Sequence, residues 1–346
     1  MNAPRLLLAI LLITSVACSG ERPADSATTS QPATEAKGDN KLVLYSGRNE
    51  KLVGPLLARF TRETGIQVEA RYGETAEMAA TLIEEGRRSP ADAFLAQDAA
   101  ALGAVSRAGL TRPLPSDVIS RIPARFAGPD GSWVGISGRA RTVVYNPKRI
   151  RPEQLPRSLE EIGTRATAGR WGIAPLNASL QSHLAVFHAT QGREALEQLL
   201  DAMVKASPRR YPRNGAIVDA VASGEIDWGL VNHYYVWEAK KERPDLAAEN
   251  FFMPEGSASS FVNVAGIALI DDDPDALRLI EFLLSDEAQQ YFATETFEYP
   301  LVAGVAAPVA LQPLEELRTP EIDFARVSAV LPETLGLINE RGLSRN

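Results

Sequence analysis

Two adjacent tyrosines are the residues whose type and position in this chain most suggest chemistry. Tyr234 and Tyr235 close the stretch Gly-Leu-Val-Asn-His-Tyr-Tyr at 229–235, where a short apolar run predicts a strand. The carboxyl ends of strands are where α/β proteins place ligands. A phenolate is a hard anionic donor that suits ferric iron, and the metal can displace a proton that free tyrosine holds up to a pKa of about 10. The pair predicts a ferric-ion site, with ordinary packing of two tyrosines as the alternative.

The elements that must position this pair follow an alternating pattern. A strand is predicted at 41–45, apolar residues then recur at helical spacing from Leu52 to Phe60, and Gly65 marks the helix end before a strand at 67–71. Further segments are expected at 76–85, 93–95, 99–108, 133–145, 171–174, 179–190, 217–222, 228–231 and 266–270. Strand-like runs that alternate with helical patterns predict an α/β fold with mixed, mainly parallel sheets.

The amino-terminal segment has the pattern of an export signal. Arg5 precedes an apolar run from Leu6 to Val16, which is shorter than the roughly 18 residues of a membrane-spanning helix, so 1–17 is interpreted as a cleaved signal peptide. Cys18 is the only cysteine, and the small residues before it resemble a lipoprotein cleavage box. We expect Cys18 to be acylated and to anchor the protein in the cell envelope, with an unanchored periplasmic product as the alternative.

The composition separates a tether from a folded body. Residues 19–39 contain no aromatic residue and no Val, Ile or Leu, which predicts a flexible linker. The remaining residues, 40–346, are too many for one typical core and suit two lobes. The net charge of −8 argues against a nucleic-acid-binding surface.

Several segments, in order along nearly all of the body, resemble one protein family. They include Tyr-Ser-Gly-Arg at 45–48, Ser-Pro-Ala-Asp-Ala-Phe at 89–94 and Ser-Gly-Arg-Ala-Arg-Thr-Val-Val-Tyr at 137–145. The others lie at 60–61, 64–66, 224–227, 232–235 and 298–301. This series resembles the periplasmic ferric-ion-binding proteins, the "bacterial transferrins". The resemblance implies a monomeric binding protein, not an enzyme, that delivers ferric ion to an ABC permease in the inner membrane.

The same resemblance implies a two-lobed periplasmic-binding-protein fold of type II, with a hinge of two crossover strands. We expect the chain to cross between lobes near Arg139–Ala140 and near Phe261–Asn263. The first lobe then comprises 40–139 plus 263–310, and the second comprises 140–262 plus 311–346. The ligand is expected in the cleft, where hinge closure buries it.

Charge balance predicts a bound anion beside the iron. Ferric ion carries three positive charges and two phenolates carry two negative ones, so phosphate or carbonate would neutralise the site and fill open coordination positions. Matching the family's anion-binding segments points to Arg139, Asn177, Ala178, Asn214 and Asn232. Ordinary alternatives are a helix cap for Asn177, a turn for Asn214 and a carboxylate partner for Arg139.

The first lobe departs from the family pattern. Many relatives supply a histidine and a glutamate there, and the matching residues in this chain are Asn49 and Gln97, whose amide oxygens are weak neutral donors. A three-tyrosine variant of the family is not met either, because Glu50 stands where it has a tyrosine. Glu50 and Glu74 are alternative carboxylate donors, or simply residues that begin helices. These departures predict a weaker iron site, a greater dependence on the anion and water, or a different ligand.

Other functional classes have less support. The alternative within binding proteins is a small organic ligand, such as a phosphonate or polyamine, with the tyrosines as an aromatic or hydrogen-bonding surface. An enzyme is the third class, but the sequence has no Gly-rich phosphate loop and no Gly-x-Ser-x-Gly motif. His233 is expected to be structural, because a hard ferric site prefers oxygen donors.

Overall fold

The computed structural model describes residues 40–255, 258–259, 261–307, 311–314, 316–317 and 322–344. The expected signal peptide, the acylation of Cys18 and the linker at 19–39 lie outside these residues. Of the helices that the structure describes, none is both long enough and apolar enough to cross a membrane.

The centre of the fold is a mixed sheet of nine strands in the order β2-β1-β3-β9-β4-β7-β5-β6, with β8 paired to β4. Parallel ladders join β1 to β2 and β3 at one end, and β5 to β6 and β7 at the other. The strands are β1 (Lys41–Ser46), β2 (Gln67–Tyr72), β3 (Ala93–Ala96), β4 (Val134–Tyr145), β5 (Trp171–Ile173), β6 (Arg209–Arg210), β7 (Trp228–Asn232), β8 (Glu249–Phe251) and β9 (Val262–Leu269). The predicted α/β class is confirmed.

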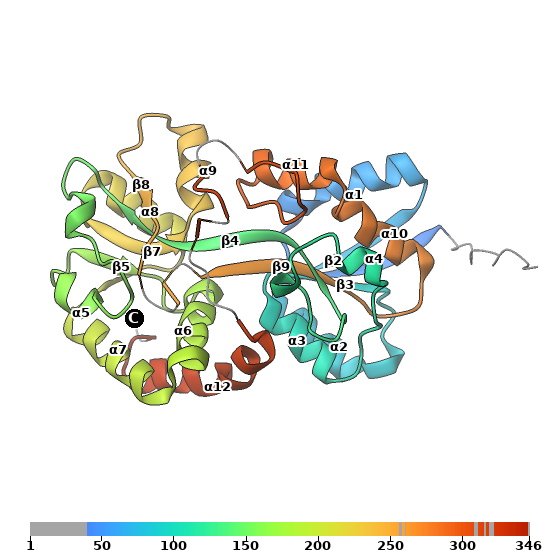
Figure 1. Ribbon diagram of the computed structural model, residues 1–346, viewed down its shortest axis with the longest axis horizontal. Coiled ribbons are helices and arrows are strands. Elements are labelled where there is room, and N and C mark those ends of the chain that lie inside the picture. Colours follow the sequence, from blue (N-terminus) through green and yellow to red (C-terminus); the bar gives the residue numbers. More distant parts are fainter. Residues whose placement is uncertain are drawn as a thin grey trace, which may run out of the picture. The chain divides into compact units, whose positions relative to one another are not determined.

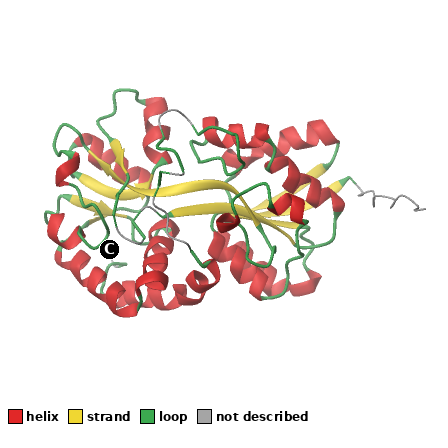
Figure 2. Cartoon of the chain, in the orientation of Figure 1, coloured by secondary structure: helices red, strands yellow, loops and turns green. Residues whose placement is uncertain are grey.

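Helices flank these strands (Figure 2) and form two groups. We call residues 41–126 and 274–295 the first region; its helices are α1 (Glu50–Thr64), α2 (Thr75–Glu85), α3 (Ala99–Arg107), α4 (Ser116–Ile119), α10 (Pro274–Leu283) and α11 (Asp286–Glu295). We call residues 162–251 the second region; its helices are α5 (Ile162–Arg165), α6 (Ala178–Gln191), α7 (Arg193–Lys205), α8 (Asn214–Ser223) and α9 (Tyr234–Glu242). Helix α12 (Phe324–Glu340) packs on both α6 and α3.

One long strand is common to both regions. All twelve residues of β4 are buried, and from Val134 to Ala140 the strand pairs antiparallel with β9. From Arg141 onward it pairs instead with β7 and β8. Figure 1 shows β4 and β9 running side by side between the two groups of helices. This is the two-strand hinge expected for the fold, while the lobe boundaries themselves stay predictions.

Helix α1 illustrates how local sequence sets an element. Its first turn begins after Asn49, whose side-chain oxygen accepts a hydrogen bond from the Lys51 amide at 2.9 Å. It ends at Gly65, where φ is 78° and glycine avoids the steric cost of a left-handed backbone. Val53, Leu56, Leu57 and Phe60 form its buried face. The predicted strand–helix–strand unit is confirmed.

The turn from β7 into α9 places the tyrosine pair. Strand β7 is buried throughout, and its neighbour β5 approaches so closely that a Cβ on Gly229 would lie 2.9 Å from the Gly172 carbonyl oxygen. Trp228 stacks on Trp171 of β5 with 4.9 Å between ring centroids. This packing fixes the end of β7, so that Tyr234 and Tyr235 open α9 just beyond its carboxyl end, as predicted.

Candidate functional site

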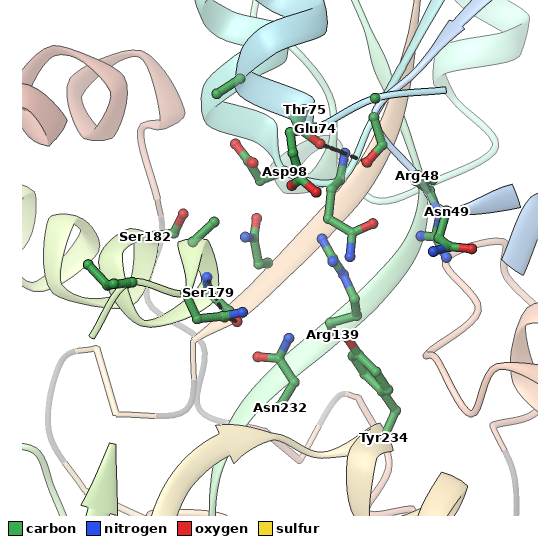
Figure 3. Close-up of a pocket in the computed structure, with 18 of the residues that line it drawn as sticks. Arg48, Asn49, Glu74, Thr75, Asp98, Arg139, Ser179, Ser182, Asn232 and Tyr234 are labelled. Carbon is green, nitrogen blue, oxygen red and sulfur yellow. Dashed lines mark hydrogen bonds between the residues drawn. The ribbon is translucent and has the colours of Figure 1, made fainter. Parts of the chain in front are cut away.

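A cavity of about 690 Å³ lies between the first and second regions and β4. Most of the predicted site residues line it, namely Asn49, Gln97, Arg139, Asn177, Ala178, Asn232, Tyr234 and Tyr235. Figure 3 shows Arg139 reaching into the middle of the cavity, with Ser179 and Ser182 on one side and Arg48 and Asn49 on the other. The fold therefore brings together residues that are up to 186 positions apart in the sequence, from Asn49 to Tyr235.

The two tyrosine rings stack on each other with 4.3 Å between centroids and 30° between planes. The Tyr234 side chain is almost fully buried, and burial raises its pKa well above the ordinary value. The neighbouring Tyr235 raises that pKa further, while Arg139 opposes the change. A buried phenol of this kind keeps its proton until a cation binds beside it, because desolvation disfavours the bare phenolate.

Arg139 is a buried guanidinium with free hydrogen-bonding capacity. Its side chain is 3 % exposed, and its Nε lies 3.8 Å from an oxygen of Glu298. Neither Nε nor Nη2 has a hydrogen-bond partner among the described residues. Buried N–H groups are rarely left unpaired in folded proteins, so this fork is suited to an anion inside the cavity.

A second guanidinium shares the same carboxylate. Arg48 Nη2 donates to Glu298 at 2.9 Å, and Arg48 Nη1 donates to the Ser137 hydroxyl at 3.2 Å. Burial alone raises the pKa of Glu298, but Arg48 and Arg139 hold it below its ordinary value. One carboxylate thus pairs with two guanidinium groups, while Glu50, Glu74 and Asp98 add further carboxylates to the cavity lining.

Two amide side chains are oriented as donors toward the cavity. The Asn177 Oδ1 accepts hydrogen bonds from the Ser179 amide and from Asn214 Nδ2, each at 3.1 Å. The Asn232 Oδ1 accepts from Arg141 Nη1 at 3.0 Å. Because both oxygens are already occupied, the amide nitrogens remain to donate. Together with the amino terminus of α6, they suit an anion.

Asn214 lies behind the cavity. Its side chain is buried, and its Nδ2 donates to Asn177 and to the Ser179 hydroxyl, each at 3.1 Å. It is the first residue of α8. A direct contact between Asn214 and an anion stays a prediction, and the observed bonds give it a role in orienting Asn177.

The first region contributes weaker donors. The Asn49 oxygen caps α1, and the side chain is exposed. The Gln97 side-chain oxygen is buried and has no hydrogen-bond partner among the described residues. Glu50 and Glu74 also line the cavity, Glu50 in the first turn of α1 and Glu74 just before α2. Which of these groups contact a ligand stays a prediction.

The histidine beside the tyrosine pair is tied to the backbone. The His233 Nδ1 accepts from the Ala140 amide at 3.1 Å, so Nε2 carries the proton and donates to the Phe297 carbonyl at 2.8 Å. Burial lowers the pKa of His233 to about 4. Both ring nitrogens are occupied, which fits the structural role expected for this residue.

Sequence reasoning missed several residues that line the cavity or pair with its lining. Arg48, Glu298 and Tyr72 were not predicted as site residues, although Arg48 and Glu298 lie in family-like segments. No local pattern shows that Arg48 meets a carboxylate 250 positions away. In the described part of the chain, no group of three or more His, Cys, Asp or Glu side chains could hold a metal.

Comparisons with known proteins identify the family of the chain. Residues 89–327 match the family described as bacterial extracellular solute-binding proteins. The chain is 30 % identical over 317 residues to an Fe(3+)-binding periplasmic protein of Serratia marcescens, covering 90 % of this chain and 93 % of that one. It is 31 % identical over 324 residues to iron uptake protein A1 of Synechocystis, covering 90 % of each.

The fold is also similar to a solved structure, iron-bound HitA from Pseudomonas aeruginosa. The TM-score is 0.81 at 31 % identity, over 87 % of this chain and 99 % of that one. These relatives are named as binding and uptake proteins. The chain therefore belongs to the bacterial extracellular solute-binding proteins and, within them, to the periplasmic ferric-ion-binding proteins that its motifs resemble.

Proposed function

We propose that this protein is an extracytoplasmic ferric-ion receptor that holds Fe³⁺ on Tyr234 and Tyr235. The observation that carries the proposal is the position of these two tyrosines, which line one cavity together with the unpartnered guanidinium of Arg139. The phenols supply anionic oxygen donors once the metal displaces their protons. The names of the relatives, an Fe(3+)-binding protein and an iron uptake protein, support the same function.

An anion completes the site. Iron with two phenolates keeps one positive charge, and the buried guanidinium of Arg139 has unpartnered N–H groups that could bind an anion. Phosphate or carbonate would accept hydrogen bonds from Arg139, from the Asn177 and Asn232 amide nitrogens and from the backbone at Ala178. The anion would thus neutralise charge and bridge the metal to the protein.

Hinge closure couples binding to transport. Bending at β4 and β9 would bring the first region over a ligand held by the second region, and an ABC permease would recognise the closed form. Opening, protonation or reduction of the iron would release it. Acylation at Cys18 would keep the receptor beside its permease.

A visible absorption spectrum during titration with ferric citrate tests this function. The wild-type protein should develop a saturating phenolate-to-iron charge-transfer band, and Tyr234→Phe/Tyr235→Phe should not. Tyr145→Phe is a matched control, because its hydroxyl bonds to Glu249 and it does not line the cavity. A wild-type protein that stays colourless while folded would contradict the proposal.

The donors of Arg139, Asn177 and Asn232 give one alternative a specific basis. A small organic anion such as a phosphonate could occupy the same donors, since a cavity of about 690 Å³ exceeds the size of a bare ion. Tight binding of a phosphonate that is unchanged by Tyr234→Phe and Tyr235→Phe would favour this alternative.

A further inference from the structure

Tyr72 lines the same cavity from the first region. It is the last residue of β2, pairs with Ser46 of β1, and its side chain is 37 % exposed. No motif in the sequence singled it out. It therefore adds a phenol from the first region to the cavity that Tyr234 and Tyr235 line from the second.

The hydrogen bonding of the eight tyrosines divides them into two sets. Five have hydroxyls bonded to carboxylates or backbone carbonyls: Tyr45 to Glu85, Tyr145 to Glu249, Tyr211 to Glu225, Tyr291 to Leu52 and Tyr299 to Gln312. The other three are Tyr72, Tyr234 and Tyr235. In the described chain their hydroxyls have no hydrogen-bond partner apart from the bond between Tyr234 and Tyr235. All three of these, including Tyr72, line the cavity.

A carboxylate lies beside the Tyr72 hydroxyl. A Cβ placed on Gly54 of α1 would lie 3.3 Å from Glu50 Cγ and 3.9 Å from the Tyr72 oxygen, so both side chains reach the same face of α1. Burial and the Glu50 charge raise the pKa of Tyr72, so the phenol keeps its proton without a metal. Two oxygen groups therefore converge at this edge of the cavity.

The two first-region residues that match the family's ligand positions, Asn49 and Gln97, cannot supply an anionic donor in the same way. The Asn49 oxygen is already the acceptor that caps α1, and Gln97 is neutral. Tyr234 and Tyr235 leave one positive charge on ferric ion. A third phenolate would remove that charge and complete a hard oxygen donor set.

We propose that Tyr72 is the first-region ligand of the closed site, a third phenolate that coordinates ferric ion together with Tyr234 and Tyr235. This inference rests on the proposed function. The Tyr72 O–H bond breaks, an iron–oxygen bond forms and the proton passes to solvent, with no change in the oxidation state of iron. The Glu50 carboxylate beside it contributes further negative charge.

The test compares Tyr72→Phe with wild type and with Tyr291→Phe in titrations with ferric citrate. Tyr291 is a matched control from the same region, because burial and a nearby glutamate also raise its pKa but it does not line the cavity. The charge-transfer band per bound iron should fall by roughly a third in Tyr72→Phe, since one of about three phenolates is lost. Iron affinity should fall about 10- to 100-fold, and Tyr291→Phe should resemble wild type.

Proton release gives a second readout that packing alone would not change. With the same iron source, Tyr72→Phe should release about one proton fewer per iron than wild type at pH 7. A band, affinity and proton count equal to wild type in Tyr72→Phe, with Tyr234→Phe/Tyr235→Phe colourless, would overturn this inference alone. A wild-type protein with no band would overturn the proposed function and this inference together.

Discussion

The two sides of the cavity are built differently. On the second-region side, Asn214 donates a hydrogen bond to Asn177, and Asn232 accepts one from Arg141. The Tyr234 ring packs against Tyr235. On the first-region side, Asn49, Glu50 and Glu74 are exposed, and the Tyr72 hydroxyl has no partner in the described chain. A preorganised side loses little conformational entropy on binding, whereas exposed side chains lose more when they contact a ligand. We therefore predict that iron binds first to the second region.

Substitution of a tyrosine on the preorganised second-region side should have the largest effect on ferric affinity. Tyr235→Phe should lower ferric affinity about 100-fold or more, because each ligand of a metal site contributes roughly 3 kcal/mol, and the double change with Tyr234→Phe should abolish binding. Competition titration against citrate measures this loss. Wild-type affinity in Tyr235→Phe would mean that the pair only packs.

Glu298→Gln should affect folding more than the substitutions of residues that line the cavity. It leaves the buried Arg48 and Arg139 without their carboxylate and should lower the free energy of unfolding by about 3 kcal/mol at pH 7. The folded pKa of Glu298 lies below its ordinary value of 4.5, so its stabilising contribution is present above that pH and disappears as the pH falls through the folded pKa. Urea unfolding of both proteins at several pH values should show the difference shrinking below pH 4.5, and a constant difference would contradict this account.

Arg139→Gln should show that a bound anion contributes to iron affinity. We expect about a tenfold loss of iron affinity in phosphate or carbonate buffer and a much smaller loss in anion-depleted buffer, because the unpartnered guanidinium acts through the anion. Arg149→Gln is a control, since Arg149 pairs with Asp227 outside the cavity. Equal iron affinity of the wild-type protein in the two buffers would remove the anion from the site.

Among these substitutions, Asn49→Ala should have the smallest effect on iron binding. It therefore tests whether the first-region side contributes less to binding than the second-region side. Loss of the α1 cap should lower the free energy of unfolding by about 1 kcal/mol, measured by thermal or urea unfolding. Iron affinity should stay within about twofold of wild type, because the capping oxygen is not available to the metal. A large loss of affinity with unchanged stability would make Asn49 a ligand after all.

The sequence predicted the parts of this molecule that local rules determine. Helix α1 between Asn49 and Gly65, and the tyrosine pair after β7, follow from capping residues and hydrophobic periodicity. The Arg48–Glu298 pair and the position of Tyr72 depend on how distant strands associate, and no local pattern encodes this. The motif resemblance supplied Arg139, Asn177 and Asn232, but their hydrogen bonds, and so the direction in which the amides donate, came only from the structure.

Strand β4 carries Arg139 and Arg141 on either side of Ala140, the residue where its pairing passes from β9 to β7. Arg139 lies beside Glu298, whereas Arg141 donates a hydrogen bond to Asn232. Any change in the twist of β4 at Ala140 must therefore alter the separation of these two charges. A change in the angle between the regions would thus move Arg139 relative to Arg141 and to the cavity residue Asn232 that Arg141 holds.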